Sequence, residues 1–171
     1  STDRASASEP EQPVSIGIAS LPSDLGTRLE RDVLMGVMQQ PAAVGTELAN
    51  RALSSTFADP NLAVVRDAVA VHLAAAGASG WIELVVNEVP DPYRTLVQQL
   101  AVAPIPGRED RIEAAVRGFA AAIIERDLLR EKRELLGALQ RLDPQADADR
   151  SSQVQRRLKL VEEDRRALKG E

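Results

Sequence analysis

Few side chains in this 171-residue chain could carry nucleophilic, acid–base or metal chemistry. His72 is the single histidine, and the chain has no cysteine. Because a zinc or transition-metal site needs several such ligands, His72 completes no metal set, and we interpret it as a histidine at the edge of a helix core. Ser54, Ser55 and Thr56 could act as nucleophiles only with His72 as their base, and no nucleophile-elbow motif surrounds them. We expect these hydroxyl groups to cap or close a turn.

Carboxylates cluster at Glu109, Asp110 and Glu113, where two acids could share proton-transfer work. We expect them instead to occupy the first turns of a long helix, because negative charge complements the helix dipole there. The glycines form neither a G-x-G-x-x-G motif nor a phosphate loop. The sequence therefore predicts no catalytic residue, no metal ligand and no cofactor site, and a chain that is not itself an enzyme.

Leucines near the end of the chain form the clearest binding pattern. One apolar stripe precedes residue 143, and a second stripe at near-heptad spacing follows residue 151. The two stripes can close on each other, while Leu136 and Leu160 lie on other faces and predict an exposed apolar patch. We expect a partner to dock there, with Arg156 and Arg157 as charges at the rim. The predicted docking residues are Leu135, Leu136, Leu139, Leu142, Val154, Arg156, Arg157, Leu158 and Val161.

These residues belong to a predicted helical hairpin. One very long helix spans Pro106–Leu142, an acidic turn occupies residues 143–149, and a returning helix spans Ser151–Lys169. At about 1.5 Å per residue the first arm would run roughly 50 Å, which is longer than a compact domain of this size is wide. Its far half must therefore protrude, and a protruding apolar hairpin is a surface suited to a partner.

The middle of the long helix, residues 125–134, is mostly charged, and only Leu128 and Leu129 in it are apolar. We expect this stretch to be in contact with water on most sides. Its charges and those of the return arm should form solvated faces with i,i+4 pairs such as Glu162 with Arg166. The apolar stripe expected to pack on the preceding helices is Ile112, Val116, Phe119 and Ile123.

Caps and breakers divide residues 21–105 into five predicted helices. The first begins at Thr27, which has capping-box spacing with Glu30, or earlier at Asp24. It ends before Pro41, and the second helix follows this proline.

The third helix has the clearest start, since Asp59 supplies an N-cap and Pro60 the first helical position. Residues 81–86 are rich in β-branched side chains, but Ser79 can cap a helix and no partner strand is present nearby, so we predict the fourth helix there. Asp91 and the proline after it begin the fifth. The predicted fold class is all-α, a compact helical bundle followed by a long shared helix and a protruding C-terminal hairpin.

Composition and charge narrow the class of partner. The formal charge is −5 and the pI about 5.1, which argues against a nucleic-acid groove or an anionic membrane as the main ligand. Residues 1–124 hold nine basic and fifteen acidic side chains, whereas residues 125–171 hold twelve and eleven. The chain has no cysteine, no leader-like opening and no apolar run near the roughly 20 residues of a membrane span, so we predict a cytoplasmic protein.

The opening residues 1–20 are rich in Ser, Ala, Glu and Pro without a sustained period, and we predict a flexible linker. A linker at the start indicates a piece of a longer protein. The expected organisation is therefore a linker over residues 1–20, a bundle over 21–124 and a hairpin over 125–171.

Three features then occur in order along the chain. The segment Leu29–Pro41 carries an acid followed by aliphatic residues and a Gln-Pro end, the turn Phe57–Pro60 precedes a helix, and a long helix with a terminal hairpin follows. Together they resemble the C-terminal helicase-binding domain of bacterial DNA primase, over about residues 21–171. The alanine-rich composition, with arginine preferred over lysine, is similar to that of actinobacterial versions.

The resemblance implies a bundle that modulates the replicative hexameric helicase and a hairpin that docks on the N-terminal domains of that helicase, coupling primer synthesis to the fork. It also implies that the zinc ribbon and polymerase core of primase lie outside this chain, in agreement with the missing cysteines. In some relatives the same domain meets the tail of single-strand-binding protein. No direct contact with nucleic acid or membrane is expected.

Two other functions stay open on the sequence. The N-terminal domain of the replicative helicase has a related bundle-plus-hairpin design, and we prefer primase because this chain starts in a linker and ends just after the hairpin. A phosphate loop downstream would identify the helicase, and a zinc ribbon upstream would identify primase. From a different class, a small all-α enzyme predicts a closed pocket lined by converging charged groups.

Overall fold

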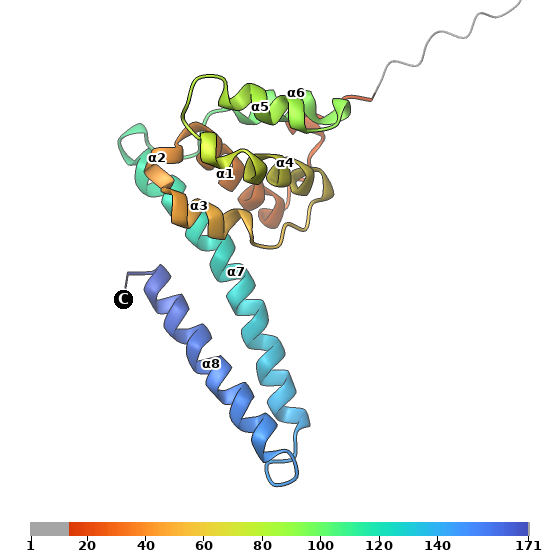
Figure 1. Cartoon of the computed structure of the whole chain (residues 1–171), viewed down its shortest axis with the longest axis vertical. Helices are drawn as coiled ribbons and strands as arrows, with labels where there is room; N and C mark the ends of the chain where they lie inside the picture. Colours follow the sequence, from red (N-terminus) through yellow and green to blue (C-terminus); the bar gives the residue numbers. More distant parts are fainter. Residues whose placement is uncertain (1–13, 171) are drawn as a thin grey trace, which may run out of the picture.

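The computed structural model describes residues 14–170, and every regular element in this part of the chain is helical. The α-helices are α1 (Leu25–Gln39), α2 (Pro41–Val44), α3 (Thr46–Leu53), α4 (Pro60–Val71), α5 (Trp81–Glu88), α6 (Arg94–Leu100), α7 (Ile112–Arg141) and α8 (Ala148–Leu168). The 3-10 helices are η1 (Ile18–Ser20), η2 (Leu73–Ala75), η3 (Asp91–Tyr93) and η4 (Glu109–Arg111). The predicted all-α fold is confirmed, since Figure 1 shows a helical bundle from which α7 and α8 extend together.

Side-chain caps begin two of the helices as the sequence indicates. Asp24 caps α1, because one of its carboxylate oxygens accepts from the Thr27 N–H at 2.9 Å and the other accepts from the Thr27 hydroxyl at 2.7 Å. The backbone N–H of Thr27 is the main cause that lowers the pKa of Asp24. The alternative start at Thr27 is therefore wrong, and Thr27 lies buried in the first turn. Asp59 caps α4 by accepting from Asn61 N and Leu62 N, as predicted.

Gly45 divides the second predicted helix in two. Its φ of 83° lies in the left-handed region, which favours glycine, and α2 ends there while α3 begins at Thr46. Six α-helices therefore precede the long arm among the described residues, in place of the five expected. The predicted helix at Trp81 is confirmed as α5, but Gly80 and not Ser79 occupies its N-cap, with no side-chain cap bond.

Helix α1 lies at the centre of the bundle and contacts α2, α4, α6 and α7. Its residues from Val33 to Met38 are all buried, as expected for a helix that is covered on every side. Leu25 is 80% exposed because it lies in the first turn, before α1 enters the core. The largest fully buried side chains from other elements are Leu62, Leu96, Leu100 and Ile123.

The segment before α1 packs on α6. Ile18 N donates to the Gln99 side chain at 2.7 Å, and Ile16 N donates to Pro92 O at 2.9 Å. These contacts differ from the flexible linker expected over residues 1–20, of which residues 1–13 lie outside the described part of the chain.

The long arm is shorter at its start than predicted. Residues 106–108 are irregular and η4 follows, so α7 begins at Ile112 rather than at Pro106. Helix α8 begins at Ala148, three residues earlier than the expected Ser151. Only Glu113 of the three clustered carboxylates lies in the first turn of α7. The 30 residues of α7 still span about 45 Å, and Figure 1 shows its first half against the bundle and its second half beyond it.

Close contact between α1 and α7 supplies a stability prediction. A Cβ atom added at Gly36 would lie 3.0 Å from Val116 Cβ, whereas one added at Gly118 would meet no heavy atom within 4 Å. Alanine gains about 1 kcal/mol over glycine in a helix interior, but a clash in a packed core costs about 1–3 kcal/mol. We expect Gly36→Ala to lower the midpoint of thermal unfolding and Gly118→Ala to raise it. Calorimetry of both variants checks this, and a rise in both would contradict the close α1–α7 contact.

Candidate functional site

An apolar seam joins the two arms of the hairpin. Val161 on α8 is 1% exposed, and Leu128 on α7, seven residues before Leu135, is 8% exposed. The other predicted docking residues of the seam are half-buried, namely Leu135, Leu139, Leu142, Val154 and Leu158. Val161 is therefore placed to hold the arms together, and the half-buried residues of the seam are partly accessible to solvent.

Ion pairs between the arms flank this seam. Lys132 Nζ lies 2.6 Å from Glu162 Oε1, and Arg157 Nε lies 2.5 Å from Glu131 Oε1. Nearer the bundle, Arg165 Nη2 lies 3.2 Å from Glu125 Oε1. The hydrogen bond from Arg157 is the main cause that lowers the pKa of Glu131, and the hydrogen bond from Lys132 is the main cause that lowers the pKa of Glu162.

These pairs correct two expectations. Residues 125–132 are all buried or half-buried, so the prediction that water contacts most sides of residues 125–134 is wrong for this part, while Arg133 and Glu134 are exposed as predicted. Most charges of residues 125–132 are instead paired with α8 or with the bundle, which the charge pattern of a single helix does not reveal. Glu162 pairs with Lys132 and Arg165, and not with Arg166 as predicted.

The pairs also define two edges of the hairpin. Residues three or four apart on a helix share a face, so Leu129 and Leu136 lie on the same edge as Lys132. Leu158 precedes Glu162 by four residues and joins this edge from α8. We call the set Leu129, Lys132, Leu136, Leu158 and Glu162 the Lys132 edge.

The opposite edge is formed around Arg157. Leu160 follows Arg157 by three residues and precedes Asp164 by four, so all three share one face of α8. Together with Glu131 they form what we call the Arg157 edge. Leu136 and Leu160 are 43% and 53% exposed, so both predicted exposures are confirmed, but the two leucines lie on different edges and do not form one patch.

The two predicted rim arginines differ in their surroundings. Arg157 bridges the arms through Glu131, whereas Arg156 is exposed and lies one turn before Leu160. Arg156 is thus an exposed charge on the side of Leu160, and Arg157 is primarily part of the hairpin itself.

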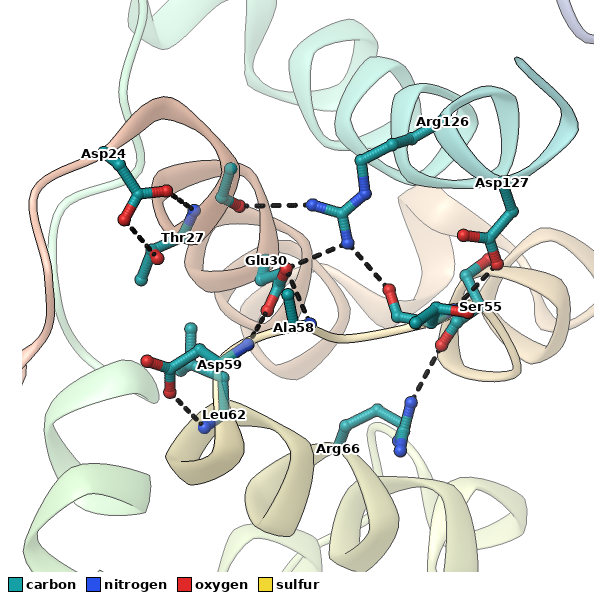
Figure 2. Close-up of polar contacts among 12 residues, drawn as sticks. Asp24, Thr27, Glu30, Ser55, Ala58, Asp59, Leu62, Arg66, Arg126 and Asp127 are labelled. Carbon is teal, nitrogen blue, oxygen red and sulfur yellow. Dashed lines mark hydrogen bonds and ion pairs between the residues drawn. The ribbon is translucent and has the colours of Figure 1, made fainter. Parts of the chain in front are cut away.

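A buried carboxylate fixes α7 to the bundle. Glu30 on α1 is 1% exposed and accepts from Ala58 N at 3.1 Å, Asp59 N at 2.9 Å and the Arg126 guanidinium at 2.9 Å (Figure 2). Arg126 also donates to Thr56 O at 2.7 Å. Three segments far apart in the chain, α1, the loop before α4, and α7, thus meet at one ion pair. Sequence reasoning missed this role, although an acid inside the apolar run of α1 was a visible signal.

The neighbouring loop between α3 and α4 is bound on both sides. Asp127 on α7 accepts from Thr56 N at 2.8 Å, and Arg66 on α4 donates to Ser55 O at 2.8 Å, as Figure 2 shows. The Arg66 guanidinium also lies 5.0 Å from the centre of the Phe57 ring. The conformation of this loop is therefore coupled to the position of α7.

The return arm is attached to the bundle as well. Arg51 on α3 binds Asp164 on α8 at 2.9 Å, and Leu168 packs against the core. Both arms are consequently anchored at their roots, while the tip carries only local bonds. There Asp143 accepts from Gln145 N at 2.8 Å and Ala146 N at 3.2 Å, which lowers the pKa of Asp143 and closes the predicted acidic turn.

Candidate reactive side chains have structural partners. Ser54 and Ser55 donate to the carbonyl groups of Asn50 and Arg51, which agrees with the predicted turn role. His72 ends α4, with Nε2 3.3 Å from Glu88 Oε2. Among residues 14–170, no group of three or more His, Asp and Glu side chains could hold a metal ion. No helix in this part of the chain has the length and apolar character to cross a membrane.

Comparisons with known proteins identify a family and a similar structure. The family model for the DnaB-binding domain of DNA primase DnaG matches residues 30–154. Among solved structures, the helicase binding domain of primase from Mycobacterium tuberculosis is similar, with 25% sequence identity and a TM-score of 0.69. That match covers 82% of this chain and 89% of the other. The search of curated proteins gave no match.

Proposed function

Because the chain belongs to the family of DnaB-binding domains of the DNA primase DnaG, we propose that it contacts the helicase through the Lys132 edge of its hairpin. The chain is an all-helical interaction domain of primase that binds the replicative helicase DnaB, without a catalytic role of its own. The family match favours neither the N-terminal domain of the helicase nor a small all-α enzyme. The proposal implies the cytoplasm as the compartment in which the two proteins meet.

Apolar exposure on the Lys132 edge is the observation that carries the choice of face. Leu136 is 43% exposed there, and Leu129 and Leu158 beside it are half-buried. The Arg157 edge has a single leucine, Leu160, between two ion pairs, whereas the Lys132 edge has three leucines and one ion pair. A few buried anchor residues contribute most of the free energy of an interface, whereas charges at the rim mainly change the association rate and the salt dependence.

The predicted docking residues then divide between two tasks. Val161, Leu135 and Val154 hold the arms together, so they shape the surface from inside. Leu136 and Leu158 meet the partner, and Leu139 and Leu142 extend this surface toward the tip. Arg156 lies on the side of Leu160, so this proposal does not use it as a rim charge. We keep the division into a bundle over residues 21–124 and a hairpin over 125–171 as part of this proposal.

A matched pair of leucine variants tests the face. We expect Leu136→Ser to weaken binding to DnaB about 10-fold or more, because an apolar anchor contributes about 1–2 kcal/mol. Leu160→Ser removes a leucine of similar exposure from the other edge and should change the dissociation constant by less than about 2-fold. Isothermal titration of each variant with DnaB gives the two constants. A larger loss for Leu160→Ser would assign docking to the Arg157 edge.

The resemblance to primase domains supports two narrower statements about partners. We propose that the tail of single-strand-binding protein is a second protein partner and that the chain makes no direct contact with nucleic acid. The four aromatic side chains are buried or half-buried, so none forms an open platform for stacking bases. When the chain is added, the fluorescence anisotropy of a labelled tail peptide should rise, and that of labelled oligothymidine should stay constant. The opposite pattern would overturn both statements.

A further inference from the structure

A shallow groove of about 220 Å³ lies on the bundle between α4 and the end of α5. Val64, Ala68 and Val71 line it from α4, and Val89 and Pro90 line it from the segment after α5. Val71 is 63% exposed, although valine is usually buried in a domain with a well-formed core. The groove therefore has a mostly apolar lining, in which Val71 is exposed to solvent.

A second exposed aliphatic side chain lies beside this groove. Leu84 precedes Glu88 by four residues on α5 and so shares its face, and it is 44% exposed. Glu88 in turn contacts His72, the residue next to Val71. Val71 is thus next to one residue of this polar contact, and Leu84 shares a helix face with the other. We call the groove together with Leu84 the α4–α5 face.

The charge around the α4–α5 face is negative. Asp67 and Glu88 line the groove, and no lysine or arginine lines it. The side chain of Asp67 is 71% exposed and that of Glu88 is 45% exposed. Arg66 binds Asp67 at 2.7 Å, but its guanidinium extends toward Phe57 and the carbonyl of Ser55. The acidic rim is thus only partly neutralised.

We propose that the α4–α5 face is a second docking surface, separate from the hairpin, for a basic amphipathic helix of a partner protein. Aliphatic side chains of that helix would cover Val71 and Leu84, and its lysine or arginine residues would lie on Asp67 and Glu88. This combination of an apolar groove and an acidic rim matches the helix-in-groove mode of recognition. The inference does not depend on which edge of the hairpin meets DnaB.

Charge also argues against two other occupants. Residues 1–13 carry three acidic side chains and one arginine, so they share the sign of the rim. A second copy of the chain would meet this face through a two-fold contact, which places the same acids opposite each other. Like charges in such a contact are unfavourable, whereas a basic helix gains from both acids.

The experiment uses the full chain, isotopically labelled for amide NMR spectroscopy. The probe is a synthetic amphipathic peptide of about 14 residues, with leucine on one face and lysine on the other. Its twin carries glutamate in place of each lysine. We expect the lysine peptide to shift the amide resonances of Val64, Val71, Leu84 and Glu88, and the glutamate twin to leave them unchanged.

Variants of exposed residues confirm the location without disturbing the core. Val71→Lys and Leu84→Lys should each weaken binding of the lysine peptide about 10-fold. Val102→Lys is the control, since Val102 is 79% exposed and lies beyond the C-terminal end of α6. Val102→Lys and Leu136→Ser should both leave the dissociation constant of the lysine peptide within about 2-fold of its value for the unchanged chain. This result would separate the α4–α5 face from the hairpin.

Other outcomes would each overturn the proposal. Shifts confined to the hairpin, or equal loss with Val102→Lys, would show that no distinct site exists on the bundle. Concentration-dependent dimers that Val71→Lys abolishes would make a second copy the occupant. Changes at Val64 and Ala68 on deletion of residues 1–13 would make the chain's own opening segment the occupant.

Discussion

Replacement of Arg126 by alanine is expected to lower the free energy of unfolding by about 3–5 kcal/mol, because it leaves the buried carboxylate of Glu30 without its cation. Glu30 is 1% exposed, and its other two partners are the N–H groups of Ala58 and Asp59. The change also removes the donor to Thr56 O. Chemical denaturation followed by far-UV circular dichroism measures the effect.

Two further variants isolate the cause of this loss. Arg133→Ala removes an exposed arginine from the same helix and should change stability by less than about 0.5 kcal/mol. Glu30→Gln combined with Arg126→Met removes both charges, so it should cost less than the sum of the two single changes. Equal effects of Arg126→Ala and Arg133→Ala would refute a stabilising role for the Glu30–Arg126 pair.

Removal of residues 143–171 is expected to weaken DnaB binding by about 100-fold or more, since it deletes α8 and exposes the seam of α7. The Lys132 edge loses Leu158 and Glu162, and Leu136 loses the neighbouring arm. Co-elution of the truncated chain with DnaB in size-exclusion chromatography tests this directly. Binding that survives unchanged would show that the hairpin is not the docking element.

The truncation needs a control because it also breaks the Arg51–Asp164 pair. Its circular dichroism spectrum should retain the helical signal of the bundle. Leu136→Asp in the full chain provides a second route, since it keeps α8 and places a charge on the Lys132 edge. Both changes should reduce binding, and a loss with truncation alone would point to misfolding of the shortened chain.

Local signals in the sequence predicted most of the helices. Asp59 and Pro60 define the start of α4 because capping and a fixed φ act within a few residues. The apolar stripe at Val116 and Ile123 likewise predicted which part of α7 is buried. The division at Gly45 was missed, since a glycine shows its left-handed conformation only in the folded chain.

Pairing across the chain could not be predicted in the same way. Arg126 and Glu30 are 96 residues apart, and Arg51 and Asp164 are 113 apart. Periodicity indicates which residues share a helix face, but it does not indicate which distant charge lies opposite. For that reason residues 125–134 were interpreted as a stretch exposed to water, and the two edges of the hairpin emerged only from the ion pairs.

Anchoring of both arms at their roots has a mechanical consequence. The hairpin is held at one end like a cantilever, with α7 fixed through Arg126 and Asp127 and α8 fixed through Asp164. These three residues contact α1, α3 or the loop that joins α3 to α4. A sideways force applied at the tip therefore acts with the leverage of the whole arm on this small region. Bending of the hairpin against the bundle would strain these bonds first, before the apolar core.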